Sequence, residues 1–181
     1  MIARLLTLFT LLGMVLPAAA QMPFTVKEGT EYVEDPVFGK LPREIIWKMD
    51  SSPMVLVPRG EYVLGVDDPI DKGYRENEGP SVTVSLTPFY IDKYETTNAQ
   101  YNVVAEIRGL SPPKAITKEE MLADDHPVVG ITYLDALEYA RVMKKDLPTA
   151  AQWEAAASGP MQQIYPWGNQ PREGAAVTGL G

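Results

Sequence analysis

Short apolar runs separated by turn-forming residues predict several short strands in this chain. Residues 54–57 are continuously apolar and predict a buried strand, and residues 61–65 predict a second strand after a Pro-Arg-Gly turn. Residues 81–86 alternate strictly, with valine and leucine on one face and serine and threonine on the other. Such alternation is typical of a strand with one exposed face, and residues 89–92 predict a further short strand.

Residues that commonly cap the start of a helix predict two helices, after Thr97 and after Thr149. Thr97 is followed by Gln100, and Thr149 by Gln152, at the spacing of a capping box, in which each side chain bonds the other residue's backbone N–H. Gly109 is expected to end the first of these helices, ahead of a Ser-Pro-Pro run that forbids its continuation. The last helix is expected to run to about residue 157.

A helix between these two is predicted by Thr132 at the cap position and by Asp135, whose carboxylate also favours the positive end of the helix dipole. Apolar residues then recur along one face and predict a stripe that faces the core. They are Tyr133, Ala136, Leu137, Ala140 and Met143. Strands and helices do not alternate along the chain, so the pattern predicts an irregular, loop-rich α+β fold rather than a doubly wound sheet.

The first twenty residues have the layout of a secretory signal peptide. Arg4 gives a positive start, residues 5–16 are apolar, and a Pro-Ala-Ala-Ala run offers a cleavage site after Ala20. The apolar stretch is short for a membrane span, which needs about 20 apolar residues. We therefore expect a secreted or periplasmic protein, with no membrane insertion after cleavage.

Three segments are expected along the chain. Residues 1–20 form the signal peptide, residues 21–51 a partly ordered extension, and residues 52–181 one domain. The extension mixes charges with prolines and shows no clear period. Its apolar run at residues 45–47 is expected to dock on the core.

Charge and cysteine content narrow the possible functions. The formal net charge is −8 at pH 7 and no basic run occurs, which argues against nucleic acid and anionic membrane surfaces as partners. Loss of the signal peptide would remove one arginine and leave the mature chain more acidic still. Cysteine is absent, so the chain holds no thiolate nucleophile, thiolate metal site or redox pair of its own.

His126 is the single histidine of the chain. A metal-ligand or general-base role would draw on its neighbours Asp124 and Asp125, but a solvated turn residue is the better interpretation. One histidine also cannot build an iron site of the two- or three-histidine kind. An acidic loop nearer the N-terminus lacks the ligand spacing of an EF-hand calcium loop and is expected to be solvated. Its members are Asp67, Asp68, Asp71, Glu76 and Glu78.

Glu95 and Glu154 lie next to aromatic residues, and either a catalytic pair of carboxylates or a structural role is open to them. The structural interpretation is favoured: each is expected to anchor a loop through hydrogen bonds to backbone N–H groups. Trp153 and Trp167 are expected to lie in the core or to anchor loops. No serine, Ser52 included, has the context of a hydrolase nucleophile, and no phosphate-binding glycine loop occurs. No catalytic, cofactor-binding or metal-binding residue is therefore assigned.

Several sequence blocks follow one another in the order of a known family's signature. They are M-V-L-V-P-R-G-E-Y-V-L-G (54–65), E-G-P (78–80), F-Y-I-D-K-Y-E-T-T-N-A-Q-Y (89–101), H-P-V-V-G-I-T-Y-L-D-A-L-E-Y-A (126–140), L-P-T-A-A-Q-W-E-A-A-A (147–157) and Y-P-W-G-N (165–169). On these blocks the chain resembles the formylglycine-generating-enzyme domain, also called the sulfatase-modifying-factor domain. The similar region, roughly residues 52–169, corresponds to the N-terminal half of a complete domain.

The resemblance implies a C-type-lectin-like α+β fold, incomplete here at the C-terminus. It also implies an oxidase that uses molecular oxygen and copper(I) to convert a cysteine of a client sulfatase, bound as an extended peptide, to formylglycine. In the family two cysteines near the C-terminal end of the domain hold the copper, and calcium ligands mostly follow the Y-P-W-G-N block. None of these positions falls in the matched region, so no cofactor is expected on this chain and the chain alone is expected to be inactive.

The chain departs from the family pattern inside the matched blocks. Ala150 and Gln152 replace two glutamates, Tyr133 replaces a tryptophan, and Ala140 stands where many relatives have cysteine. These changes keep helix propensity while reducing charge. The last eight residues offer no element to close a sheet edge. The chain is then either a fragment of a longer protein, which we favour, or a truncated product that depends on a partner.

Two functions remain open. The first is an exported protein that in complete form is a formylglycine-generating oxidase acting on sulfatase cysteine. The second is a non-catalytic, lectin-like module for binding or assembly in the cell envelope. Two suitably placed cysteines in the rest of the domain would favour the oxidase.

Overall fold

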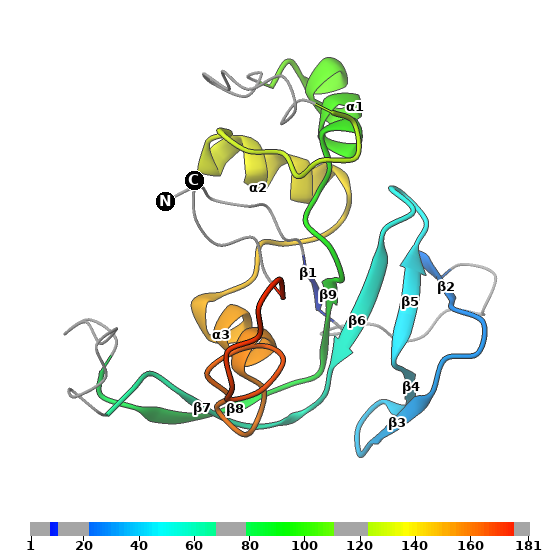
Figure 1. The fold of residues 1–181 in the computed structure, drawn as a ribbon. Helices are drawn as coiled ribbons and strands as arrows, with labels where there is room; N and C mark the ends of the chain where they lie inside the picture. The colour runs from blue at the N-terminus through cyan, green and yellow to red at the C-terminus, as the bar shows by residue number, and fades with distance from the viewer. Residues whose placement is uncertain (1–7, 11–21, 68–78, 111–122, 176–181) are drawn as a thin grey trace. The chain divides into compact units, whose positions relative to one another are not determined.

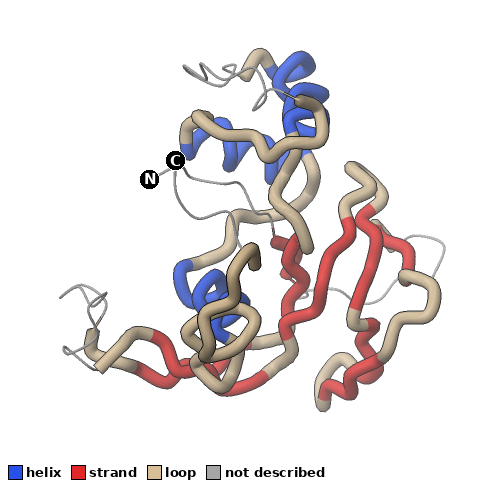
Figure 2. Tube along the Cα trace, in the orientation of Figure 1, coloured by secondary structure: helices blue, strands red, loops and turns tan. Residues whose placement is uncertain are grey.

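The computed structural model describes residues 8–10, 22–67, 79–110 and 123–175 (Figure 1). In this part the chain is an α+β protein with small antiparallel sheets and three helices, as the sequence predicted. Loops join the short elements over much of the trace (Figure 2).

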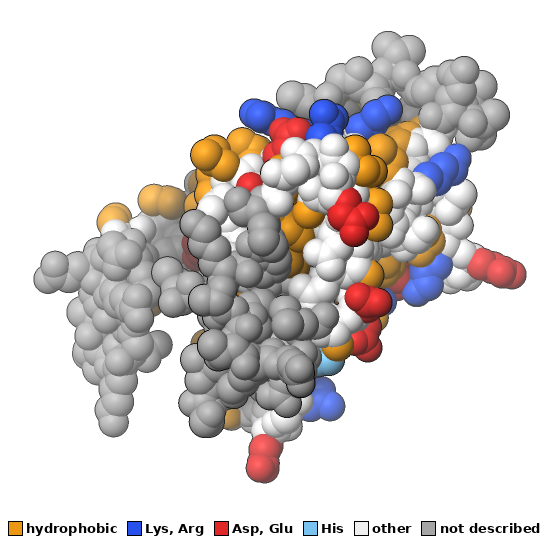
Figure 3. All heavy atoms as spheres, turned by 90° about the horizontal axis from the view of Figure 1, so that it is seen from above, with side chains coloured by type: hydrophobic (Ala, Val, Ile, Leu, Met, Phe, Trp, Pro, Cys, Tyr) orange, Lys and Arg blue, Asp and Glu red, His pale blue; other side chains and the backbone are white. Residues whose placement is uncertain are grey.

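The chain divides into two compact units, each formed by two segments that are distant in sequence. The first unit comprises Met1–Arg59 and Thr87–Pro148, and the second comprises Gly60–Leu86 and Thr149–Gly181. On the face drawn in Figure 3, the described acidic and basic side chains are interspersed with hydrophobic and neutral ones.

A five-stranded antiparallel sheet belongs to the first unit (Figure 1). Its strands, in order across the sheet, are β1 (Leu8–Thr10), β9 (Phe89–Asp92), β6 (Pro53–Val57), β5 (Glu44–Trp47) and β2 (Phe24–Val26). Strands β6 and β9 are those that the apolar runs predicted, and β9 is buried at every residue. Strand β1 lies within the expected signal peptide and pairs with β9; cleavage of that peptide stays a prediction.

The segment expected to be a partly ordered extension contains four strands in its described residues. Strand β5 pairs with β2 and with β6, and β3 (Tyr32–Asp35) pairs with β4 (Gly39–Pro42). Each strand is three or four residues long, so it buries at most two side chains and leaves no visible period in the sequence. Docking of residues 45–47 on the core is confirmed, because Ile45 and Trp47 are completely buried.

The core under this sheet is built from large side chains whose polar atoms are satisfied. Its buried members are Leu41, Ile45, Trp47, Met54, Leu56 and Tyr90. The indole N–H of Trp47 donates to the carbonyl of Met143 at 2.8 Å, and the hydroxyl of Tyr90 donates to the carbonyl of Pro42 at 2.6 Å. Each fully buried side chain of this size contributes about 1.5–3 kcal/mol, provided that no polar atom is left unpaired.

Helix α1 (Asn98–Arg108) begins as the sequence predicted. The hydroxyl of Thr97 accepts from the backbone N–H of Gln100 at 3.3 Å, and the Gln100 amide oxygen accepts from the backbone N–H of Thr97 at 2.9 Å. Gly109 ends the helix with φ +64°, a left-handed conformation that glycine adopts without steric cost. The capping box and the helix end are both confirmed.

Helix α2 (Tyr133–Val142) also has the predicted cap at Thr132, but its buried stripe begins one turn later than expected. Tyr133 is 69% exposed, and Tyr139, which was not included in the stripe, is completely buried. The buried positions are Ala136, Tyr139, Ala140 and Met143. Packing decides the difference, because the ring of Tyr139 stacks on that of Tyr101 from α1, with 6.1 Å between the ring centroids.

In the second unit, β7 (Gly60–Leu64) pairs with β8 (Val82–Leu86), and α3 (Ala150–Ser158) packs against β7. Tyr62 of β7 is 1% exposed. Strand β8 keeps the predicted alternation of half-buried and exposed residues, except at its first residue, Val82, which is 52% exposed.

Candidate functional site

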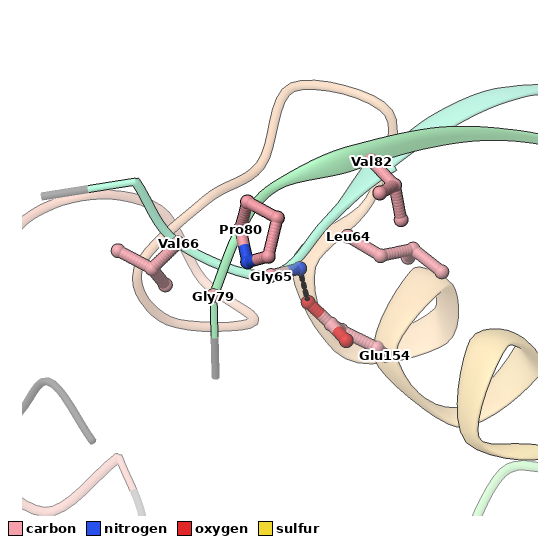
Figure 4. Close-up of a pocket in the computed structure, with 7 residues that line it drawn as sticks. All are labelled: Leu64, Gly65, Val66, Gly79, Pro80, Val82 and Glu154. Carbon is pink, nitrogen blue, oxygen red and sulfur yellow. Dashed lines mark hydrogen bonds between the residues drawn. The ribbon is translucent and has the colours of Figure 1, made fainter. Parts of the chain in front are cut away.

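A pocket of about 480 Å³ opens in the second unit (Figure 4). It lies between the end of β7 and the start of β8, beside α3. The lining residues are Leu64, Gly65, Val66, Gly79, Pro80, Val82 and Glu154. Apart from Glu154, the lining residues are glycine, proline, leucine and valine, so Glu154 is the one titratable residue among those that line it. Such a pocket offers shape and a single negative charge for binding, but no partner carboxylate for acid–base catalysis.

Helix α3 presents Glu154 to this pocket. The helix starts at a confirmed capping box, with the Gln152 backbone N–H donating to the Thr149 hydroxyl at 3.2 Å and the Thr149 N–H donating to the Gln152 amide oxygen at 3.0 Å. The Glu154 carboxylate then accepts the backbone N–H of Gly65 at 2.6 Å, as Figure 4 shows. The prediction that Glu154 anchors a loop through a backbone N–H is confirmed.

The backbone N–H and the backbone carbonyl of Gly65 are both hydrogen-bonded to side chains. Gly65 has φ +80°, a conformation that side-chain-bearing residues rarely adopt. Its N–H donates to Glu154, and its carbonyl accepts from the side-chain amide of Gln162 at 2.5 Å. These two bonds fix the rim of the pocket to α3 and to the loop that follows it.

A buried ion-pair cluster forms a second candidate, in the first unit. The ammonium of Lys145 donates to Asp50 Oδ2 at 2.8 Å, to Asp92 Oδ1 at 2.8 Å and to Ser52 Oγ at 2.7 Å. The side chains of Lys145, Asp50 and Asp92 are 0%, 3% and 4% exposed. The Tyr139 hydroxyl donates to Asp50 at 3.3 Å, and burial, then the charges of Asp50 and Asp92, raises its pKa.

This cluster is saturated and closed to solvent. An ammonium group has three N–H donors, and each finds an oxygen within hydrogen-bonding distance here. A lysine held in this way cannot act as a nucleophile, because its nitrogen has no free lone pair and no access to a substrate. The cluster instead ties the segment after α2 to the turn before β6 and to the end of β9, so its role is structural.

Sequence reasoning missed this cluster. Lys145 stands in a Lys-Lys-Asp run that reads as an exposed helix end, and its two acidic partners are 53 and 95 residues away in the chain. Asp92, at the end of an otherwise apolar strand, was the available signal, because a carboxylate in such a place needs a buried partner.

His126 is 51% exposed and makes local contacts. Its Nδ1 lies 3.1 Å from Asp125 Oδ1, and its carbonyl accepts the backbone N–H of Asn98 at 2.9 Å. The prediction of a turn residue with local hydrogen bonds is confirmed. Glu95, the other carboxylate of the suggested pair, is half-buried in the first unit, whereas Glu154 belongs to the second. Its loop-anchoring role stays a prediction.

The two tryptophans of the second unit have different outcomes. Trp167 anchors a loop as predicted: its indole N–H donates to the carbonyl of Gln170 at 3.1 Å, and its ring stacks on that of Tyr165, with 5.1 Å between centroids. Trp153 is 45% exposed, so the first of its two predicted placements, in the core, was wrong, and loop anchoring stays a prediction. The reason is its position on α3, where Ala155 is the residue that is buried.

Among the residues that the structure describes, no cluster of three or more histidine or acidic side chains is suited to hold a metal ion. Of the acidic loop, Asp67 is described and accepts the backbone N–H of Ser81 at 2.7 Å; the pKa of its carboxyl is lowered by hydrogen bonds from the Ser81 side chain and backbone. The other members of the acidic loop, Asp68, Asp71, Glu76 and Glu78, lie outside the described residues.

Across the residues that the structure describes, no helix is long and apolar enough to span a membrane.

Comparison with known proteins decides the family. The model of the sulfatase-modifying factor enzyme 1-like domain matches residues 46–179, which is most of the chain. The chain belongs to this family. The match covers both units and includes α3, the pocket and the Y-P-W-G-N loop.

Relatives of this sulfatase-modifying-factor chain include proteins with and without a stated activity. An uncharacterised protein of Bacillus subtilis, YfmG, is 34% identical over 72% of the chain and 31% of its own length. The formylglycine-generating enzyme of Thermomonospora curvata is 31% identical over 65% of the chain and 52% of its own length. An inactive Cα-formylglycine-generating enzyme 2 of mouse is 28% identical over 71% of the chain and 55% of its own length. The chain thus spans about a third to a half of the curated relatives that it matches.

Proposed function

We propose that this chain works as part of a formylglycine-generating system that oxidises a cysteine of a sulfatase. The observation that carries the proposal is the family match over residues 46–179, together with 31% identity to an enzyme named for this activity. The family name, sulfatase-modifying factor, supports a protein or peptide client. An acidic chain without basic runs suits such a client better than nucleic acid.

The copper ion of the family does not fit this chain by itself. Copper(I) is soft and prefers thiolate ligands, and the chain contains no cysteine. We therefore assign the copper-holding thiols, and any calcium ligands, to a further segment that completes the domain. On this view the chain contributes the scaffold and its pocket, and the completing segment contributes the reactive groups.

We further propose that the completed domain has a C-type-lectin-like arrangement. Small antiparallel sheets, long loops and internally bonded turns such as that at Gly65 support this proposal. Circular dichroism of a completed domain should accordingly show low helix content with a folded near-ultraviolet signal.

Export is part of the proposal. The positive start, the apolar run and the small residues before Gln21 support a signal peptide. N-terminal sequencing of protein recovered from the periplasm or the medium is expected to begin at Gln21. Recovery of the whole chain from the cytoplasm with Met1 in place would contradict export.

The activity assay incubates the protein with a cysteine-containing sulfatase peptide, copper(I) and oxygen. The mass of the peptide is then measured. The chain alone is expected to leave the thiol unchanged. A fusion of the chain to the part of the Thermomonospora curvata enzyme that it does not match is expected to convert the thiol to an aldehyde. The control is the same fusion with the cysteines of that added part replaced by serine.

The outcomes of this assay test two points: where the copper-holding thiols lie, and whether the protein is an oxidase or a binding module. Aldehyde formation by the chain alone would contradict our assignment of the thiols to another segment. A folded, copper-binding fusion that binds the peptide without converting it would contradict the oxidase and favour a binding module.

A further inference from the structure

One edge of β9 is covered by residues of the expected signal peptide. Strand β1, Leu8–Thr10, pairs with β9 in antiparallel register, with Phe9 opposite Tyr90. It is the last strand on that side of the five-stranded sheet (Figure 1). Phe89 and Tyr90 of β9 are each 1% exposed, so β1 covers a strand that lies in the interior of the first unit.

The register shows which backbone groups of β9 depend on β1. The backbone N–H and C=O groups of successive residues in a strand point to opposite sides, and the N–H of Lys93 donates to the carbonyl of Pro53 in β6 at 2.9 Å. Counting back along β9, the backbone groups of Ile91 point to β6 and those of Tyr90 point to β1. A buried backbone group without a partner costs about as much free energy as a lost hydrogen bond. Phe9 is therefore the residue that satisfies Tyr90 in the uncleaved chain.

The residues of β1 have a second use, which requires another conformation. Residues 5–16 are uncharged and mostly apolar, and in a signal peptide such a stretch enters the membrane during export. Inside a bilayer a single segment satisfies its backbone groups only as a helix. Leu8–Thr10 cannot be part of a membrane helix and a strand on β9 at the same time. The membrane and β9 therefore compete for the same segment of the chain.

We propose that the signal peptide is a two-state segment, and that its pairing with β9 in a folded, uncleaved chain withholds it from export and processing. Folding before export closes the sheet with β1 and keeps the signal peptide on the chain. Export before folding lets a peptidase remove β1 and leaves this edge of β9 free. The inference rests on the proposed export with cleavage after Ala20, and it adds a role for the signal peptide in the folded chain.

Two proline variants test the pairing by itself. The full chain is made by cell-free translation without membranes, so that the signal peptide is retained. Phe9→Pro removes an N–H that faces Tyr90 and is expected to accelerate hydrogen exchange of the Tyr90 amide at least tenfold. The matched control, Thr10→Pro, removes an N–H of the same strand that points away from β9 and is expected to leave this exchange unchanged. The Ile91 amide, which faces β6, serves as the internal reference and is expected to exchange equally in all three chains.

Purified signal peptidase in detergent tests the consequence for processing. The peptidase is mixed with each full chain either after the chain has folded or directly on dilution of the chain from urea, and the rate of cleavage after Ala20 is followed by mass. The unsubstituted chain and the Thr10→Pro control are expected to be cleaved at least tenfold more slowly when folded. Phe9→Pro is expected to be cleaved at similar rates in both states. The ratio of the two rates within one chain cancels any effect of the proline on recognition by the peptidase.

The results distinguish failure of this proposal from failure of export. Equal exchange of the Tyr90 amide in all three chains, or equal cleavage of the folded and the urea-diluted unsubstituted chain, would overturn the competition and leave export standing. Absence of cleavage after Ala20 even from urea would contradict export, and the competition with it. Faster exchange of Ile91 in Phe9→Pro would mean that this variant has lost the sheet, and the two cleavage rates of the unsubstituted chain then decide. None of these measurements involves copper or a sulfatase peptide, so they are independent of the proposed oxidase activity.

Discussion

Lys145 shows how much one buried residue can hold together. Its ammonium is completely buried and faces two carboxylates, so this one cation stabilises both buried anions. A buried charge left without its partner costs far more than a surface pair, because no water replaces the lost contacts.

Replacing Lys145 is therefore expected to be severe. Lys145→Met leaves Asp50 and Asp92 without their shared cation and should lower the free energy of unfolding by about 3–5 kcal/mol, measured by urea titration. The matched control, Lys144→Met, alters the exposed neighbour and should change it by less than about 0.5 kcal/mol. A loss below about 1 kcal/mol in the Lys145 variant would show that the two carboxylates find other partners.

At the same scale, Glu154 is expected to stabilise the pocket rim through one hydrogen bond. Glu154→Ala removes the acceptor of the Gly65 N–H and should cost about 1–3 kcal/mol, whereas Glu154→Gln keeps an acceptor and should cost less. Hydrogen exchange at the Gly65 amide gives the local readout and should accelerate most in the alanine variant. Equal exchange in both variants would contradict the assigned role of the carboxylate.

At the scale of elements, caps define where the helices begin. Helices α1 and α3 start at capping boxes and α2 at a threonine cap, and each boundary follows from two or three local residues. Strand boundaries depend on distant partners. Strand β5, for example, acquires its place from β2 on one side and β6 on the other.

The cap of α3 gives a test at this scale. Thr149→Ala removes the acceptor of the Gln152 N–H and should destabilise the chain by about 1 kcal/mol. Thr149→Ser keeps the hydroxyl and should differ from the unsubstituted chain by only a few tenths of that amount, about 0.3 kcal/mol. Urea titration followed by circular dichroism measures both. A larger loss in the serine variant than in the alanine variant would argue against capping as the cause.

At the scale of the molecule, buried tyrosines link stability to alkaline pH. Burial, and after it the charge of Asp135, raises the pKa of Tyr101 from 10.0 to about 12. Burial is also the main cause of the raised pKa values of Tyr90 and Tyr139. A raised pKa in the folded chain means that the folded state holds the proton more tightly than the unfolded state does.

The sign of the pH effect follows from this. The stabilisation is present in full below pH 10, where the tyrosines of the unfolded chain are still protonated, and it is lost as the pH rises from 10 toward 12. The midpoint of thermal unfolding should therefore fall steeply over that range, with tyrosinate absorbance appearing together with unfolding. Tyrosinate formation complete near pH 10 in the folded chain would contradict burial of these rings.

Local sequence alone determined the helices, the predicted strands of residues 53–92 and the family, because caps, turns and short apolar runs act over a few residues. It also indicated that Glu154 anchors a loop. Only the tertiary structure decided which partner Glu154 takes, how β5 enters the sheet, and that Lys145, Asp50 and Asp92 meet. The side-chain contacts of Glu154 and Lys145 join residues 53 to 95 positions apart. The free energy that selects them comes from burial and charge pairing, which leave no periodic pattern in the sequence.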